Sequence, residues 1–252
     1  MSNPIPLRLR PSTKAIRTTA SSGRAMVRAI TFDAFGTLID TGRDVLIRIA
    51  RSVCDDQRPS LDAEALLATW DRHFFAAETA PFLTLAEITE DSLAKTFREY
   101  AIDASPAPYV DRLVTLWREA KAYAEVPRVL DTLDGVPRAV VSNADHEFLL
   151  DILQRNALRF DAVITSESAQ TYKPRPRIFE AALESLRVRP EDVIHVGDSL
   201  VADVQGASRL GMRTVWVNRG DLHRGPADPA PDAEAHDLRE LPAIIERLSQ
   251  DR

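Results

Sequence analysis

The chain has 252 residues but only one cysteine, Cys54, so an internal disulfide and a cysteine-based zinc site are both excluded. It contains no stretch of 18 apolar residues, which argues against a transmembrane helix. It also lacks an excess of basic residues, because its formal net charge is −6. An acidic chain is a poor general binder of nucleic acid. We therefore expect neither a nucleic acid nor a membrane as a partner.

The first 25 residues contain no acidic side chain and differ in composition from the rest. They hold five basic residues and three prolines. Because such a composition cannot bury a core, residues 1–25 are predicted to form a disordered basic extension. The segment lacks the apolar run of a secretory signal, and we expect a cytoplasmic location. A chain that starts at Met26 should keep its melting temperature and its activity.

Apolar periodicity divides the remaining residues into two kinds of structure. A short buried strand is predicted over 26–32, and the pattern from 43 to 124 is helical with no strand-like run. From about 126, short apolar strands alternate with helices. The predicted strands are 139–142, 162–164, 193–196 and 214–217, the predicted helices are 129–133, 147–156, 177–186, 201–210 and 238–248, and 219–236 is predicted to be a loop. The pattern predicts an α/β fold, a doubly wound parallel sheet built from 26–41 and 126–252, with an inserted all-helical subdomain at 42–125.

Polar residues follow the predicted strands at the points where these strands end. Asp33 follows the first strand, and Ser142 ends the second. Lys173 lies in the loop after the third strand, while Asp198 follows the fourth and Asp203 lies in the next helix. Because the carboxyl ends of parallel strands meet at one edge of a sheet, these side chains should converge on a single crevice.

The chemistry of this residue set favours a hard cation. Three carboxylates suit Mg²⁺, which prefers oxygen ligands, whereas the absence of a His/Cys cluster argues against zinc. A carboxylate beside such an ion can act as a nucleophile, and Asp33 is the candidate. Lys173 would add a positive charge that stabilises the transferred group.

Four segments together resemble the motifs of the haloacid dehalogenase superfamily, in the right order. They are Phe-Asp33-Ala-Phe-Gly-Thr37-Leu, Val-Val-Ser142-Asn143, Tyr-Lys173-Pro-Arg-Pro-Arg-Ile-Phe179 and His-Val-Gly-Asp198-Ser-Leu-Val-Ala-Asp203. The resemblance implies a Rossmann-like core and a helical cap that closes over the site and selects the substrate. It also implies that Asp33 is the nucleophile, that Ser142 binds the phosphoryl group, and that Lys173 pairs with Asp33 and the substrate.

The same resemblance implies a Mg²⁺ ion held by Asp33, the backbone carbonyl of Phe35, and Asp198, with Asp203 in or next to the coordination shell. Thr37 and Asn143 are expected to contact the substrate. The implied partner is a small anionic metabolite, and the chain is expected to be a monomer or a homodimer.

One position departs from the phosphatases of this family, which usually carry a second Asp two residues after the nucleophile as a general acid/base. Here that residue is Phe35, which cannot transfer a proton. An aromatic residue at this position resembles the metal-free dehalogenases of the family, in which Asp33 would attack carbon and displace halide. His73 and Glu78 are candidates for a substitute acid.

The fourth motif favours the phosphatase interpretation. The family's dehalogenases have Ser where this chain has Asp198 and Asn where it has Leu200. They also carry an aromatic hydroxyl where this chain has Phe179. The sequence therefore favours Mg²⁺-dependent phosphoryl transfer over dehalogenation. A third interpretation is a weakly active or inactive member that binds a metabolite.

Overall fold

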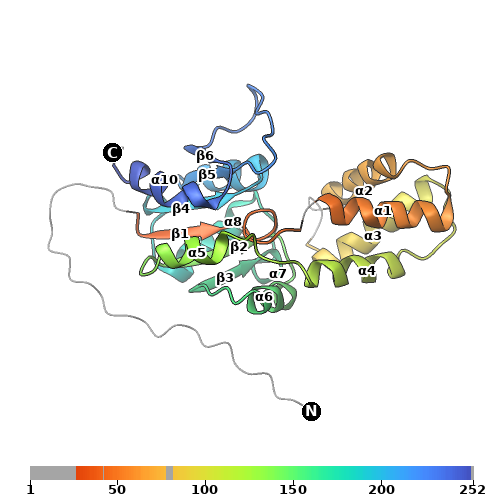
Figure 1. Cartoon of the computed structure of the whole chain (residues 1–252), viewed down its shortest axis with the longest axis horizontal. Helices are drawn as coiled ribbons and strands as arrows, with labels where there is room; N and C mark the ends of the chain where they lie inside the picture. The colour runs from red at the N-terminus through yellow and green to blue at the C-terminus, as the bar shows by residue number, and fades with distance from the viewer. Residues whose placement is uncertain (1–26, 42, 78–81, 251–252) are drawn as a thin grey trace, which may run out of the picture.

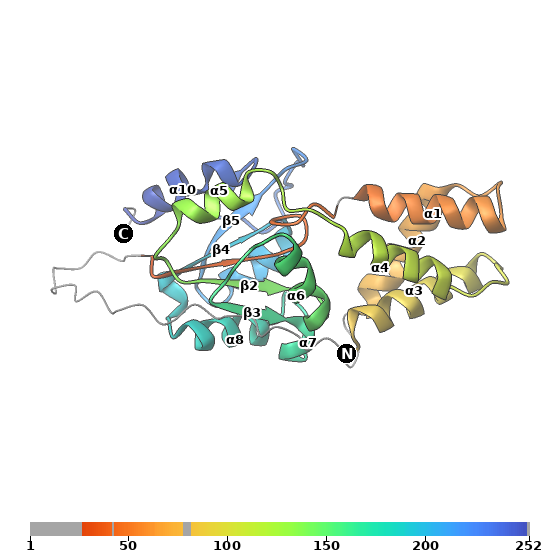
Figure 2. The same ribbon diagram turned by 60° about the horizontal axis from the view of Figure 1, so that its bottom comes forward.

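The computed structural model describes residues 27–41, 43–77 and 82–250. The predicted extension 1–25 and residue Glu78 lie outside these ranges. The described chain forms two parts, a sheet-centred core and a helical insert that projects from one end of it (Figures 1 and 2).

The core contains one six-stranded parallel sheet with the order β3-β2-β1-β4-β5-β6. Its strands are β1 (Ala29–Phe32), β2 (Arg138–Ser142), β3 (Ala162–Thr165), β4 (Val193–Gly197), β5 (Arg213–Val217) and β6 (Ala233–Ala235). β1, β2, β4 and β5 are buried along their whole length, as expected for a parallel sheet covered on both faces. β1 lies between β2 and β4, so the order of connection reverses beside it. Such a switch point is where doubly wound sheets form their ligand crevice.

Helices cover both faces of the sheet (Figure 2). One face packs against α5 (Val126–Thr132), α6 (His146–Arg155) and α10 (Leu241–Leu248), and the other packs against α7 (Ser166–Ala169), α8 (Pro176–Leu186) and α9 (Gly206–Ser208). Neighbouring residues of a strand point to opposite faces of the sheet. Ile30 and Val140 therefore pack against the first group of helices, whereas Ala29 and Val141 pack against the second.

The helical insert consists of α1 (Arg43–Gln57), α2 (Ala63–Ala77), α3 (Leu85–Glu99) and α4 (Ala107–Arg118). These helices share a separate hydrophobic cluster that includes Ile49, Trp70 and Leu113. Two chain segments join the insert to the core and pair with each other, since Tyr123 N donates to Leu38 O at 3.0 Å. The insert therefore stands at the carboxyl ends of the strands, above the switch point (Figure 1).

A second connection runs from the core to the first turn of α3. The Asp145 carboxylate accepts hydrogen bonds from Leu85 N at 2.6 Å and Ala86 N at 3.0 Å. The Tyr172 hydroxyl donates to Leu83 O at 2.9 Å. Both core residues lie close in sequence to predicted site residues, so the insert is anchored directly beside the site.

The predicted fold class is confirmed, with corrections to individual elements. The predicted loop 219–236 contains β6, which pairs with β5 between Val215 and Ala233. The predicted helix 201–210 is instead a π-helical turn, Leu200–Gln205, followed by the short α9. The predicted final helix is a 3₁₀ turn, Leu238–Glu240, followed by α10, and a further 3₁₀ turn at Pro190–Asp192 precedes β4. A three-residue strand and a wide helical turn leave no apolar periodicity of their own, which is why the sequence did not indicate them.

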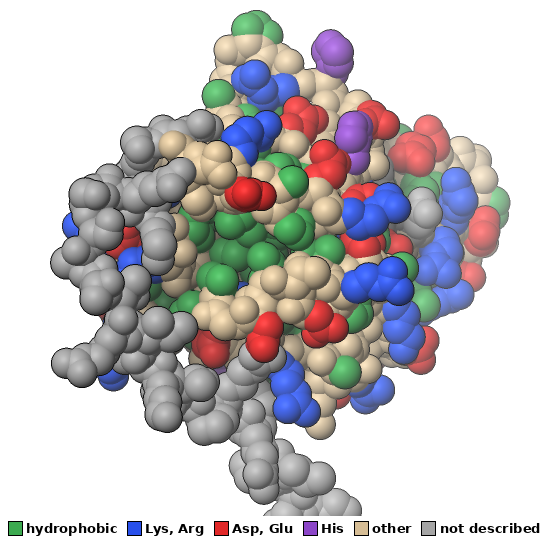
Figure 3. Space-filling model, turned by 60° about the vertical axis from the view of Figure 1, so that its left-hand side comes forward, with side chains coloured by type: hydrophobic (Ala, Val, Ile, Leu, Met, Phe, Trp, Pro, Cys, Tyr) green, Lys and Arg blue, Asp and Glu red, His purple; other side chains and the backbone are tan. Residues whose placement is uncertain are grey.

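In the described ranges, no helix combines the length and apolar character needed to cross a membrane. Figure 3 shows the end of the core that lies away from the insert, where acidic and basic side chains are interspersed around a central hydrophobic area. The described side chains on that face form no broad field of one charge.

Candidate active site

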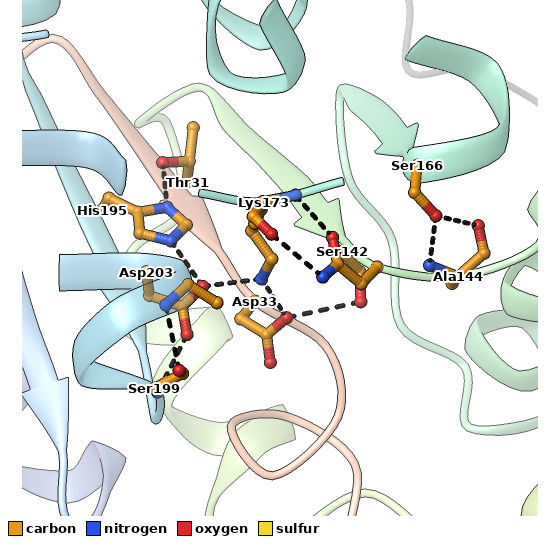
Figure 4. Close-up of polar contacts among 11 residues, drawn as sticks. Thr31, Asp33, Ser142, Ala144, Ser166, Lys173, His195, Ser199 and Asp203 are labelled. Atoms are coloured by element: carbon orange, nitrogen blue, oxygen red, sulfur yellow. Dashed lines mark hydrogen bonds and ion pairs between the residues drawn. The ribbon is translucent and has the colours of Figure 1, made fainter. Parts of the chain in front are cut away.

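The carboxyl ends of β1, β2 and β4 bring three predicted site residues, Asp33, Ser142 and Asp198, to one edge of the sheet. Phe32 pairs with both Val140 and Val196, so the residues that follow these positions emerge side by side. Asp33 continues the ladder by donating its backbone N–H to Val196 O at 2.8 Å. Ser142 then reaches Asp33, with its Oγ donating to Asp33 Oδ1 at 3.3 Å (Figure 4).

Lys173 joins the two buried carboxylates of the site. Its Nζ donates to Asp33 Oδ1 at 2.5 Å and to Asp203 Oδ1 at 2.6 Å (Figure 4). All three side chains are buried, with at most 5% of each residue exposed. Both Asp33 contacts use Oδ1, and Oδ2 makes no hydrogen bond with the described residues. The lysine therefore fixes the carboxylate and leaves one of its oxygens available.

The loop that carries Lys173 is held by Asn143, at the end of the neighbouring strand. Asn143 Oδ1 accepts from Lys173 N at 2.8 Å, and its Nδ2 donates to Lys173 O at 3.5 Å. The Lys173–Pro174 peptide bond is cis. Asn143 thus positions the lysine backbone, while its predicted contact with substrate stays a prediction.

Burial and charge act in opposite directions on these groups. Burial would lower the pKa of Lys173, but Asp203 and Asp33 outweigh it and raise that pKa above its ordinary value. Burial also raises the pKa of Asp33, although Lys173 partly opposes this. The pKa of Asp203 is lowered, because Lys173 and His195 outweigh the opposing effect of burial. Lys173 is therefore a cation and Asp203 an anion at neutral pH.

His195 is a site residue that the sequence analysis did not single out. It is fully buried on β4 opposite Thr31, and its ring lies edge-on to Phe179 with the centroids 5.1 Å apart. Its Nε2 lies 3.1 Å from Asp203 Oδ1, and its Nδ1 lies 2.8 Å from Thr31 Oγ1. Because the Asp203 carboxylate accepts, Nε2 of His195 donates to it, and Nδ1 pairs with the Thr31 hydroxyl. The only sequence signal was a polar residue inside an otherwise apolar strand.

Asp198 completes a cluster of three carboxylates. One ligand oxygen from each of Asp33, Asp198 and Asp203 can be chosen so that all lie within 4.8 Å of one another. The Asp198 side chain is exposed toward a cavity even though protein atoms surround its base. Desolvation by those atoms, followed by repulsion from Asp33 and Asp203, raises its pKa well above the ordinary value. One lysine against three carboxylates leaves an excess of negative charge that a divalent cation would balance.

Two glycines leave room for this cluster. A Cβ on Gly36 would lie 2.2 Å from Asp198 Oδ2, and a Cβ on Gly197 would lie 2.2 Å from Asp203 Cγ. Gly36 also has φ of +86°, in the left-handed region that side chains disfavour. Any larger residue at either position would displace a carboxylate.

Phe35 and Thr37, on the loop between Asp33 and the insert, differ in their surroundings. The Phe35 ring packs near Phe148, with centroids 6.4 Å apart, and lines the cavity. Thr37 is fully buried, and its Oγ1 has no hydrogen-bond partner among the described residues. Its predicted contact with substrate stays a prediction.

Arg219 holds this loop from the core side and was also missed by the sequence analysis. Its guanidinium donates to Gly36 O at 3.2 Å and to Thr37 O at 2.9 Å. It lies 3.5 Å above the centre of the Tyr123 ring and pairs with Glu125 at 2.7 Å. Arg219 therefore ties together the loop after Asp33 and the segment that returns from the insert.

A cavity of about 460 Å³ opens between the core and the insert beside Asp198. Phe35, Gly36 and Asp198 line it from the core, whereas Asp71 and Trp117 line it from the insert. Neither candidate for a substitute acid is placed there by the structure. His73 does not line the cavity and pairs with Glu99 at 3.0 Å, and Glu78 lies outside the described residues. Asp71 is the carboxylate that the insert contributes to the cavity wall.

Comparisons with known proteins agree with the architecture. The sequence pattern of a haloacid dehalogenase-like hydrolase matches residues 27–211. (S)-2-haloacid dehalogenase 4A of Burkholderia cepacia is 30% identical over 202 residues, covering 77% of this chain and 84% of that protein. N-acylneuraminate-9-phosphatase of Homo sapiens is 24% identical over 239 residues, covering 90% of this chain and 96% of that protein. A crystal structure of a dehalogenase with an intermediate complex is 25% identical, with a TM-score of 0.71 over 88% of this chain and 98% of that one.

Proposed function

The chain belongs to the haloacid dehalogenase-like hydrolase family, and we propose that it is a Mg²⁺-dependent hydrolase that removes a phosphoryl group from a small anionic metabolite through Asp33. The observation that carries this proposal is the grouping of Asp33, Asp198 and Asp203, whose ligand oxygens lie within 4.8 Å of one another beside Lys173. A metal-free reaction gives no reason to hold three carboxylates together, because their mutual repulsion raises the free energy of the folded chain.

The residues present fit a hard cation with oxygen ligands. Asp33, the backbone carbonyl of Phe35, and Asp198 would hold Mg²⁺. Asp203 stands beside them, but its oxygens already accept from Lys173 and from Ser199 N, which favours an orienting role for Asp203. When bound, the ion would neutralise the repulsion between these carboxylates and an anionic phosphate.

The contacts of Asp33 support its role as the nucleophile. Lys173 and Ser142 hold Oδ1 and thereby orient the carboxylate for attack on phosphorus. A bond from Asp33 to phosphorus forms as the bond from phosphorus to the ester oxygen breaks, and the leaving group departs with its electron pair. Lys173 stays protonated and stabilises the negative charge on the transferred group. Water then hydrolyses the aspartyl phosphate and regenerates Asp33.

The Phe35 side chain cannot protonate the leaving group, and this limits the substrates that the proposed enzyme can process. General acid/base catalysis typically contributes about 10²–10⁴-fold to a rate. Hydrolysis of p-nitrophenyl phosphate, whose leaving group needs no proton, should therefore exceed hydrolysis of sugar phosphates. Equal rates on the two substrates would contradict this reasoning.

A second candidate function is 2-haloacid dehalogenation, in which Asp33 forms an ester with the substrate carbon. The aromatic side chain of Phe35 favours dehalogenation, as does the similarity to the dehalogenase of Burkholderia cepacia. Asp198 argues against dehalogenation, because a reaction without metal gains nothing from a carboxylate beside the nucleophile.

A paired assay separates these functions. Phosphate release from p-nitrophenyl phosphate and halide release from 2-chloropropionate are measured with and without EDTA. We expect phosphate release that EDTA abolishes, and no halide release. Halide release that survives EDTA would establish the dehalogenase instead.

Replacement of the nucleophile tests whether the chain is an enzyme at all. Asp33→Asn should abolish phosphate release, whereas Asp103→Asn, at an exposed position on the insert, should match wild type. If Asp33→Asn matches wild type in both assays, Asp33 is not a nucleophile, and a metabolite-binding protein becomes the better interpretation.

A further inference from the structure

A second cavity is lined mainly by the insert and reaches Asn143 of the core, next to the candidate active site. Its volume is about 200 Å³, larger than an engineered apolar cavity of about 150 Å³ that holds a benzene molecule. Aromatic and aliphatic side chains make up most of its wall, among them Trp70, Phe74, Phe75, Leu113 and Trp117. The cavity is therefore large enough for one aromatic ring and offers it apolar surfaces.

Most polar groups in this wall already have partners. Thr89 Oγ1 donates to Leu85 O at 2.7 Å, and the Trp70 indole N–H donates to Ser92 Oγ at 2.9 Å. Asn143 is engaged with the backbone of Lys173. A substrate with many hydroxyl groups would lose its hydrogen bonds to water here and gain few in return, which is unfavourable.

The apolar cavity adjoins the larger one beside Asp198. Asp71, Phe75 and Trp117 line both cavities, and Asn143, in the wall of the smaller one, directly follows Ser142. A molecule in the smaller cavity can thus present a phosphoryl group at the edge of the sheet.

Two exposed hydrophobic side chains face the larger cavity from opposite sides. Phe75 of the insert is 61% exposed and Leu222 of the core is 66% exposed, and both line it. Single exposed apolar side chains are common, but apolar groups that line the same cavity can together cover a ligand. Here the two groups are placed to cover the apolar part of a substrate.

From this lining, together with the missing acid at Phe35, we propose that the substrate is a phosphate ester of a phenol-type hydroxyl, whose aromatic ring occupies the apolar cavity. The inference rests on the proposed function and specifies its substrate class. The ordinary pKa of a phenol is near 10, as in tyrosine, so a phenolate can leave without a proton donor. Asp33 bonds to phosphorus, the bond from phosphorus to the aryl oxygen breaks, and the phenolate leaves with the electron pair and is protonated by water.

Kinetics on substrates with and without a ring test the inference. Acetyl phosphate has a good leaving group and no aromatic body, so it reports the chemistry alone. Trp117→Ala should raise the KM for phenyl phosphate on the order of tenfold, as expected for loss of aromatic packing, and should raise the KM for acetyl phosphate much less. Leu116→Ala, on the same helix but lining neither cavity, is the control and should change neither KM.

The outcomes separate the two proposals. If wild type hydrolyses neither substrate, the proposed function is wrong. If it hydrolyses acetyl phosphate, but Trp117→Ala leaves the KM for phenyl phosphate unchanged, only the aromatic substrate class is overturned.

A binding measurement tests the ring site without turnover. By calorimetry, phenylphosphonate should bind wild type roughly tenfold more tightly than methylphosphonate, and Trp117→Ala should remove the difference. Equal affinities for the two phosphonates in wild type would overturn the inference whether or not the protein turns over a substrate.

Discussion

Gly36→Ala is expected to disturb the proposed metal site far more than it strains the backbone. The position has φ of +86°, and an L-residue in the left-handed region is disfavoured by about 1–2 kcal/mol. The added Cβ would also lie 2.2 Å from Asp198 Oδ2, whereas ordinary contacts of a Cβ begin near 3.4 Å. The carboxylate must therefore move by about 1 Å in a closely packed region.

Such a displacement would remove Asp198 from the reach of the proposed Mg²⁺ ion, whose ligand distances vary little. We expect Mg²⁺ affinity to fall on the order of 10–100-fold, the range found when the groups around a metal are disturbed. At an ion concentration of about 100 times the wild-type Kd, bound Mg²⁺ stabilises wild type by about 2.7 kcal/mol. A hundredfold weaker site would leave about 0.4 kcal/mol of that stabilisation.

Gly135→Ala supplies the matched control. Gly135 has φ of +88°, but a Cβ there would meet no described atom within 4 Å. It therefore carries the backbone strain without the contact to Asp198. For a chain of this size, the strain alone should lower the Tm by roughly 2–8 °C in both variants.

The assay is thermal unfolding with and without MgCl₂, followed by a Mg²⁺ titration of phosphate release. Wild type and Gly135→Ala should gain the same stabilisation from Mg²⁺, and Gly36→Ala should gain much less. If the two variants lose equal stability and respond identically to Mg²⁺, then Asp198 is not a metal ligand.

Three further expectations concern stability. Lys173→Met leaves the Asp33 and Asp203 carboxylates buried without their shared cation, so the free energy of unfolding in urea should fall by about 3–5 kcal/mol, whereas Lys95→Met, at an exposed helical pair, should change it by about 0.5 kcal/mol or less. Asp145→Ala removes the carboxylate that accepts from the first turn of α3, and the same measurement should show a loss of about 1–2 kcal/mol that Asp145→Asn partly restores. The folded pKa of Asp203 lies below its ordinary value of 3.8. Its stabilising contribution is therefore complete above about pH 5 and is lost as the pH falls below 3.8 toward the folded pKa. Acid unfolding followed by circular dichroism should therefore be less steep in Asp203→Asn, and an unchanged acid transition would contradict the assignment.

The fold could be predicted to the level of its architecture because buried parallel strands leave a strong pattern. Short apolar runs separated by helical periodicity indicate a doubly wound sheet, and the structure has one. β6 left no such pattern, because its three residues include the exposed Glu234. It is a strand only because β5 pairs with it.

The sequence predicted which residue types form the candidate site and at which edge of the sheet they lie. It did not predict which of their atoms are in contact. Asp33 and Ser142 end neighbouring strands, and a parallel sheet brings such ends together whatever the details of packing. The sequence also placed Lys173 and Asp203 near them, although it could not show that one Nζ serves both carboxylates. The role of His195 was missed for the same reason: its contacts to Thr31 and Asp203 join different elements, and the sequence does not show such contacts.

The sequence by itself thus determined the parallel sheet, the order of its helices and the chemical character of the residues at its edge, because these follow from periodicity and residue type along the chain. Only the tertiary structure decided which oxygen of Asp33 is held, that Asn143 supports the lysine, and that an apolar cavity meets the site. Those features depend on distances between segments far apart in sequence, and such distances exist only once the insert has packed against the core.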